Sequence, residues 1–108
     1  SIAWNGSEWL LGGGTPVASY SILGSAFLYL YNSTAFSNLT PSLPDYIQGA
    51  NSGSSILSIA TSSSGGSWVI GGYAGSTGIL LVYNGTAITD LSKLTGDMSY
   101  VNWVGISP

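Results

Sequence analysis

Short apolar segments alternate with clusters of Gly, Ser, Asn and Thr along the whole chain of 108 residues. The apolar segments are rich in Ile, Leu, Val, Trp, Tyr and Thr, which are the residue types that favour strands. None of them carries a convincing helical period. The pattern therefore predicts an all-β chain, with strands over residues 1–4, 9–12, 27–31, 35–39, 56–61, 68–71, 79–83 and 87–91.

The predicted strands fall into two sets of four because the sequence repeats itself. Residues 8–14 (EWLLGGG) match residues 67–73 (SWVIGGY), and residues 31–40 (YNSTAFSNLT) match residues 83–92 (YNGTAITDLS). The first copy is longer between its second and third strands, within residues 15–25. Repetition of this kind is typical of architectures in which one supersecondary unit stacks on the next.

Asn and Gly mark the turns between the predicted strands. The Asn-Gly pairs at residues 5–6 and 84–85 predict two-residue hairpin turns, in which both central residues have positive φ. Asn-Ser at residues 32–33 is expected to turn in the same way, less easily. The Gly clusters at residues 12–14 and 71–72 are followed by no helix and no nearby Lys, so they predict close packing or a bulge rather than a phosphate site.

Four antiparallel strands in a repeat of roughly 50 residues are the pattern of a β-propeller blade. We expect residues 1–45 to form a first blade-like repeat and residues 46–97 a second. Residues 98–108 would begin the next repeat or form a strand that connects subunits. Because a blade cannot bury both of its faces alone, the two blades are expected to belong to a larger tandem or oligomeric array.

A family resemblance rests on the first hairpin and on the third strand of the second copy. Residues 2–13 (IAWNGSEWLLGG) and 81–86 (LVYNGT) resemble tandem β-propeller repeats of archaeal cell-surface proteins, kelch-like or galactose-oxidase-like in layout. The resemblance implies the blade fold and not an activity, since propellers host many functions. Residues 61–66 depart from the pattern of residues 4–6, which predicts a longer first hairpin in the second copy.

The near absence of charge excludes several functions. The chain has only five charged side chains and a net charge of −3, and it contains no Cys, His or Arg. His-based nucleophilic catalysis, zinc binding and the copper site of galactose oxidase therefore lack their residues. One Lys cannot neutralise a nucleic-acid backbone. We expect no enzyme activity, no cofactor, no metal and no nucleic-acid partner.

Two further absences shape the expected function. No apolar run approaches the ~18 residues of a membrane span, and no signal peptide is visible.

Asp45 and Asp97 occupy equivalent positions in the two copies, so we interpret them as parts of connecting turns and not as a glycosidase pair. An enzyme fragment whose catalytic residues lie in further blades is the weakest interpretation.

Asn-x-Ser/Thr triplets are dense for so short a chain, and they predict N-glycosylation of surface loops. Sugar would also supply the solubility that a surface almost without charge lacks. Asn32 and Asn84 are the strongest candidates, because they are equivalent hairpin tips, although a purely structural turn role is an alternative for the Asn-Gly pairs. Asn38 is weaker, because it aligns with Asp90 inside a strand. The four candidate sites are Asn5, Asn32, Asn38 and Asn84.

Aromatic residues also recur at equivalent positions. Trp9 matches Trp68 and Tyr31 matches Tyr83, which favours a core between the blades over platforms for sugar stacking. Trp4 and Trp103 have no aromatic counterpart, so they are candidates for a surface or subunit contact.

Together these features predict an extracellular, cell-surface structural glycoprotein module, which self-assembles end to end into a filament, sheath or surface layer. Its partners would be copies of itself and N-linked glycans. The alternative is a carbohydrate- or protein-binding β-propeller module of a cell-surface protein. The residues expected at the assembly interface are Ser1, Ile2, Trp4, Tyr100, Val101, Trp103, Val104 and Ile106.

Overall fold

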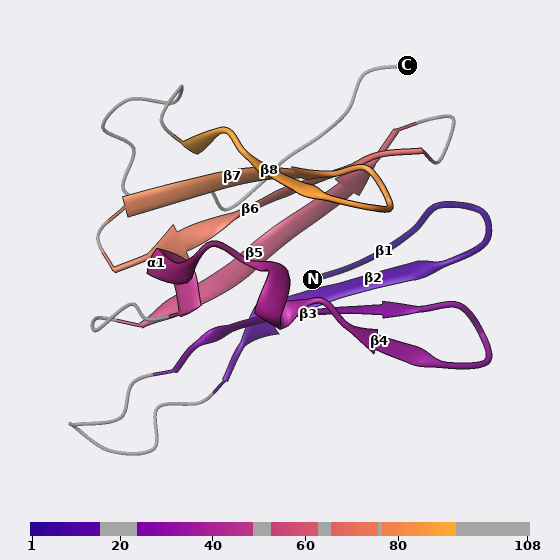
Figure 1. Cartoon of the computed structure of the whole chain (residues 1–108), viewed down its shortest axis with the longest axis horizontal. Coiled ribbons are helices and arrows are strands. Elements are labelled where there is room, and N and C mark those ends of the chain that lie inside the picture. The colour runs from indigo at the N-terminus through magenta and orange to yellow at the C-terminus, as the bar shows by residue number, and fades with distance from the viewer. Residues whose placement is uncertain (16–23, 49–52, 63–65, 76, 93–108) are drawn as a thin grey trace.

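The structure is a computed structural model, which describes residues 1–15, 24–48, 53–62, 66–75 and 77–92 (Figure 1). It contains two four-stranded antiparallel sheets in which neighbouring strands follow one another along the chain. Sheet 1 consists of β1 (Ile2–Trp4), β2 (Trp9–Gly14), β3 (Ala26–Tyr31) and β4 (Phe36–Asn38). Sheet 2 consists of β5 (Ser54–Thr61), β6 (Trp68–Ala74), β7 (Thr77–Tyr83) and β8 (Ile88–Asp90).

The two sheets confirm the predicted all-β class and the predicted order of strands. The internal repeat is also a repeat in register, because Trp9 pairs with Tyr31 in sheet 1 and Trp68 pairs with Tyr83 in sheet 2. The first hairpin of the second copy is longer, as expected, since Thr61 pairs with Trp68 and encloses six residues.

Sheet 2 packs on one face of sheet 1, with β5 crossing β1, β2 and β3. Residues that alternate along β2, β3, β5, β6 and β7 are buried in this interface, which is the normal consequence of the two-residue period of a strand. We call the two packed faces the inner faces and the opposite two the outer faces. The core between them is mainly aliphatic, and its largest fully buried side chains are Trp68, Leu10, Leu28, Ile47, Ile56, Ile70, Ile79 and Leu81.

The glycine clusters have the structural role that the sequence predicts. A Cβ atom added to Gly12 would lie 2.6 Å from Ile56 Cγ2 and 3.1 Å from Ile59 Cδ1, so Gly12 allows β5 to approach β2 closely. A β-bulge interrupts the β5–β6 register between Ile56 and Ser58. Opposite the bulge, a Cβ atom on Gly72 would clash with the backbone carbonyl of Ser55.

The connection between the sheets contains two short helices that the sequence pattern does not predict. A 3₁₀ turn covers Thr40–Ser42, and α1 covers Asp45–Gln48. Ile47 is fully buried in the core and anchors this segment. The Gln48 side-chain amide closes the segment by donating to the carbonyl of Leu43 at 2.6 Å. No helix in the described part of the chain is long and apolar enough to cross a membrane.

Candidate assembly surface and glycosylation turns

The outer face of sheet 1 is covered by large apolar side chains. Residues that stand opposite one another in the strand register share a face, so the register identifies this set. We call it the aromatic face, and it consists of Ile2, Trp4, Trp9, Leu11, Phe27, Tyr29, Tyr31 and Phe36.

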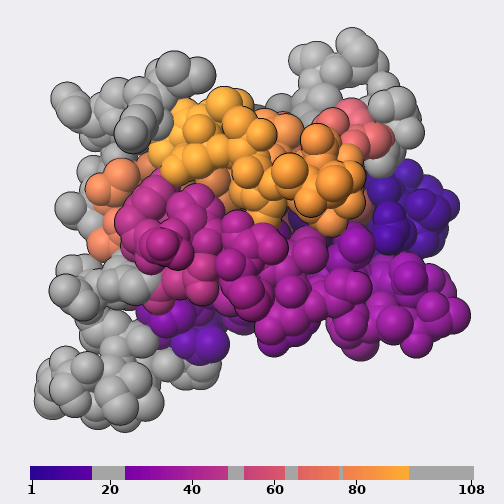
Figure 2. All heavy atoms as spheres, in the orientation of Figure 1, coloured from indigo at the N-terminus to yellow at the C-terminus, as the bar shows by residue number. Residues whose placement is uncertain are grey.

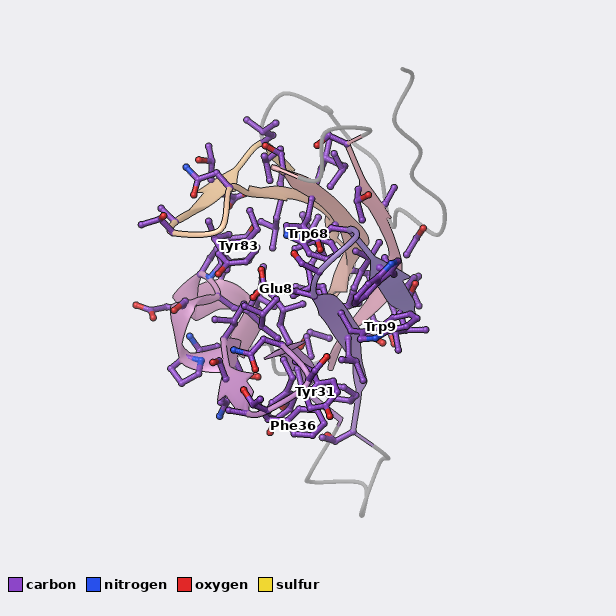
Figure 3. All side chains as sticks on the ribbon, turned by 90° about the vertical axis from the view of Figure 1, so that its right-hand side faces the viewer. Glu8, Trp9, Tyr31, Phe36, Trp68 and Tyr83 are labelled. Atoms are coloured by element: carbon purple, nitrogen blue, oxygen red, sulfur yellow. The ribbon has the colours of Figure 1, made fainter. Side chains whose placement is uncertain are left out.

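Four aromatic rings form a row across all four strands of sheet 1. Trp4 and Trp9 have ring centroids 4.9 Å apart, and Tyr31 and Phe36 have centroids 4.5 Å apart. Trp9 and Tyr31 are register partners in the middle of the row. Figure 3 shows Trp9, Tyr31 and Phe36 on the side of sheet 1 that faces away from sheet 2. The rings therefore pack on one another and leave their other surfaces open.

The aromatic face is exposed, whereas its counterpart in the second repeat is buried. Phe36 is 65% exposed, Ile2 56% and Trp4 45%. The equivalents of Trp9 and Tyr31 in sheet 2 are Trp68 and Tyr83, which are only 2% and 5% exposed. Both lie between the sheets in Figure 3. The prediction of a core between the repeats is thus confirmed for the second copy, while the first copy presents the same positions to solvent.

The sequence carries a signal for this face that the repeat comparison alone misses. Residues 27–31 read Phe-Leu-Tyr-Leu-Tyr, so aromatic and aliphatic residues alternate. In β3 the aromatic residues occupy the outer face, and Leu28 is fully buried on the inner face. Phe27 also covers Gly13, since an added Cβ atom there would lie 2.9 Å from Phe27 Cζ.

The residues expected at the assembly interface are only partly described. Ser1 is exposed and extends β1, because its carbonyl accepts the amide of Gly12 at 2.8 Å. Ile2 and Trp4 belong to the aromatic face. Tyr100, Val101, Trp103, Val104 and Ile106 lie outside the described residues, as do Lys93 and Asp97. Asp45 lies exposed in α1, within the connection between the sheets.

Three Asn-x-Ser/Thr triplets form one and the same turn. Asn5, Asn32 and Asn84 each follow a strand, and the side-chain Oδ1 of each accepts the backbone amides two and three residues ahead. These bonds measure 2.7–3.1 Å, with Glu8 N–H to Asn5 Oδ1 at 2.7 Å. Positive φ occurs only at the second residue of each turn, which is Gly6, Ser33 or Gly85. The expected two-residue turn is therefore wrong: the loop has four residues, and the Asn side chain caps it.

These three turns lie at the same end of the molecule, at the right in Figure 1. Figure 2 shows the first two of them, in indigo and purple, protruding at that end. Asn32 and Asn84 are exposed, and Asn5 is half-buried. The Thr34 hydroxyl donates to Asn32 Oδ1 at 2.8 Å, so the Asn and the hydroxyl residue of this triplet are already in contact.

The fourth triplet, at Asn38, has a different environment. Its Thr40 hydroxyl accepts the backbone amide of Leu28 at 2.9 Å and donates to the carbonyl of the same residue at 3.3 Å. In sheet 2, Ser92 makes the equivalent bond to the amide of Leu80 at 2.9 Å. The hydroxyl of the Asn38 triplet therefore closes the end of sheet 1 and faces the strand, not the solvent.

The α1 segment also fastens the two repeats through a polar contact. The Tyr46 hydroxyl donates to Asp90 Oδ2 at 2.7 Å and lies 3.2 Å from Ser92 Oγ. In Figure 2 the magenta surface of residues 40–48 adjoins the yellow end of β8. Desolvation of the hydroxyl raises the pKa of Tyr46, the bond to Ser92 lowers it, and Asp90 raises it further.

Tyr83, the other tyrosine whose pKa is raised, lies in the interface between the two sheets. Burial raises the pKa of Tyr83 above its ordinary value of 10.0, and the negative charge of Glu8 adds to this effect. The backbone carbonyl of Glu8 closes the β1–β2 turn by accepting the backbone amide of Asn5 at 3.1 Å. Within the described residues, no three His, Cys, Asp or Glu side chains cluster to hold a metal ion.

Comparison with known proteins adds no relative: the chain matches no protein-family model, no curated protein and no solved structure.

Proposed function

We propose that this chain is an extracellular structural glycoprotein module that assembles end to end with copies of itself through the aromatic face. The observation that carries the proposal is the contrast between the repeats. The aromatic face of sheet 1 is open to solvent, whereas the face of sheet 2 that has the equivalent register positions is buried. Large contiguous apolar faces of this kind are typical of surfaces that contact another macromolecule.

The physical driving force is the burial of apolar surface, at roughly 25 cal/mol for each Å² removed from water. The aromatic face carries no carboxylate and no Lys, so a partner can cover it without desolvating a charge. Its side chains lie on paired strands and its rings pack on one another, which limits the side-chain entropy lost on association. These features suit a permanent contact between proteins.

The arrangement of the sheets also supports the proposal that each sheet is a blade of the β-propeller type. Each sheet is a meander of four antiparallel strands. The face that a neighbouring blade would cover is buried in sheet 2 and exposed in sheet 1. We propose that further sheets, from copies of this chain or from tandem repeats, continue the stack. The exposed Asn32 and Asn84 turns would carry N-linked sugar at one end of the stack, beyond the strand pairs Tyr31–Phe36 and Tyr83–Ile88 that close these turns.

The second candidate function is carbohydrate binding, and the row of four rings across sheet 1 favours it. Aromatic rings stack well on the apolar faces of sugars, and a flat sheet can present several of them to one polysaccharide. Assembly is the better interpretation because Ile2 and Leu11 share the face with the rings. In addition, Trp4 is tilted by 41° against Trp9, so these two rings do not offer one plane.

Electron microscopy combined with intact mass tests the proposal on the native chain. Filaments or sheets, together with masses above 11.0 kDa by hexose-sized steps, are the expected result. Monomers of unmodified mass, with Trp fluorescence that responds to a soluble polysaccharide, would replace it with the carbohydrate-binding function.

A further inference from the structure

The turn between β7 and β8 places an amide side chain beside an unhindered backbone nitrogen at an exposed position. Asn84 and Gly85 are both exposed, and a Cβ atom added to Gly85 would meet nothing within 4 Å. In the described part of the chain, the backbone amide of Gly85 donates no hydrogen bond. This amide is therefore accessible to a base, and its nitrogen is available as a nucleophile.

The cap of the turn holds the carbonyl group that such a nucleophile would attack. Asn84 Oδ1 accepts the backbone amides of Thr86 and Ala87, both at 2.8 Å. Two N–H donors at this distance are the arrangement that stabilises the developing oxyanion in acyl-transfer reactions. They would therefore stabilise the negative charge that forms on Oδ1 when a nucleophile adds to Cγ.

We infer that Asn84 is a site at which the chain modifies itself when this side chain carries no sugar. The Gly85 nitrogen loses its proton to a base and attacks Cγ of Asn84, and the bond between Cγ and Nδ2 breaks. The side-chain nitrogen takes up a proton and leaves as ammonia, so a cyclic succinimide remains. Water then opens either ring carbonyl, which yields aspartate or isoaspartate. The reaction needs no second copy, so it is independent of the proposed function.

The turn at Asn32 has a similar cap but lacks the unhindered nitrogen. The backbone amides of Thr34 and Ala35 lie 3.1 Å and 3.0 Å from Asn32 Oδ1. The next residue is Ser33, whose Cβ atom crowds the nitrogen that would attack. Ser33 has φ 80°, close to the 90° of Gly85, so this turn accommodates Ser at its second position. We therefore expect Asn32 to react slowly in an otherwise equivalent turn.

The turn at Asn5 contains the glycine, but its surroundings are less favourable. Asn5 is half-buried, whereas Asn84 is exposed. The turn also includes Glu8, and a carboxylate opposes the negative charge that develops during the attack. Residues 84–87 contain no charged side chain. The expected order of rates is therefore Asn84, then Asn5, then Asn32.

Conversion of Asn84 has two consequences for the molecule. It adds a carboxylate to a chain that has only five charged side chains, so a single event changes the charge of the folded protein measurably. A sugar on Nδ2 would prevent the loss of ammonia. Glycosylation and succinimide formation are therefore competing fates of the same side chain.

The test uses the full chain from a host without an N-glycosylation pathway, incubated in mildly alkaline buffer. Mass spectrometry of its peptides follows conversion at each Asn. The two turns supply a matched pair of variants, because Gly85→Ser and Ser33→Gly exchange their second residues. Gly85→Ser should slow conversion at Asn84 by roughly tenfold or more, which corresponds to about 1.4 kcal/mol in the barrier. Ser33→Gly should start conversion at Asn32, and circular dichroism checks that both variants are folded.

The expected result is release of ammonia and a more acidic band on isoelectric focusing, with Asn84 converted first in the folded native chain. Conversion that occurs only in denaturant would overturn the inference, since the fold would then protect Asn84. Conversion at Asn32 as fast as at Asn84, or an unchanged rate in Gly85→Ser, would also overturn it. Sedimentation of the same samples reports on assembly separately.

Discussion

Gly12 and Gly13 show how single residues set the distance between the sheets. They are neighbours in β2 but face opposite sides of sheet 1. An added Cβ atom on Gly12 meets the branched β-carbon region of Ile56, whereas one on Gly13 meets the far end of the Phe27 ring. The first neighbour is fixed in the core, and the second can turn away on an open face.

Gly12→Ala should therefore destabilise the fold by about 1–3 kcal/mol, the usual cost of overpacking a core. Gly13→Ala is the matched control and should cost much less. Chemical denaturation of both variants at low protein concentration measures the difference. Equal stabilities of the two variants would contradict the close approach of β5 to β2.

Glycan occupancy should differ between the exposed turns at Asn32 and Asn84 and the Asn38 triplet, whose Thr40 hydroxyl is bonded to the neighbouring strand. In a host with an N-glycosylation pathway, Asn32→Gln and Asn84→Gln should each remove one glycan from the intact mass, since both side chains are exposed. Asn38→Gln should leave the mass pattern unchanged, because the Thr40 hydroxyl is bonded to Leu28. A glycan lost only in Asn38→Gln would reverse this assignment.

Tyr83 should make the protein less stable in alkali. Its pKa is raised in the folded state, so its contribution is complete below the unfolded value of 10.0 and is lost as pH rises through the folded pKa. Tyr83→Phe should therefore flatten the fall of unfolding free energy between about pH 9 and about pH 12. Glu8→Gln, which removes the nearby charge, should act in the same direction and less strongly. A slope unchanged in Tyr83→Phe would show that burial of this hydroxyl does not matter.

At the scale of elements, the strand-favouring residue types predicted the strands well, because β2, β3, β5, β6 and β7 bury apolar side chains in the core. The turns were predicted in place but not in type. Asn Oδ1 offers the backbone amides a local acceptor, so Asn32 need not adopt positive φ and the loop grows to four residues. The helical segment was missed because it is short and its core contacts, through Ile47, depend on sheet 2.

Ser54 joins three elements and supplies the prediction at this scale. Its buried hydroxyl donates to the Ile47 carbonyl and accepts the Ala26 amide, both at 2.8 Å. Ser54→Ala leaves these two backbone groups without that partner and should cost about 1–3 kcal/mol in unfolding free energy. Ser55→Ala is the neighbouring control, since its own hydroxyl makes only a 3.4 Å bond to Ile56. Thermal unfolding compares them, and equal midpoints would refute the role of Ser54.

For the whole molecule, the sequence predicted that two repeats would leave faces open, but it did not predict which face. Trp9 and Trp68 are equivalent in sequence, and only their positions in the stack make one exposed and the other buried. The account of function depends on this asymmetry. Sheet 1 covers the equivalent face of sheet 2 within the chain, and we propose that a further copy covers the aromatic face of sheet 1.

Sedimentation velocity over a range of concentrations tests this claim most directly. The decisive variant is Trp4→Ser combined with Phe36→Ser, which removes two of the most exposed rings from the aromatic face. Leu57→Ser is the control, because Leu57 is a large apolar residue that is 37% exposed but lies on β5 of sheet 2, outside the aromatic face. We predict that the native chain and the control form larger species as concentration rises and that the double variant stays a folded monomer. Association of the double variant equal to that of the native chain would contradict the account.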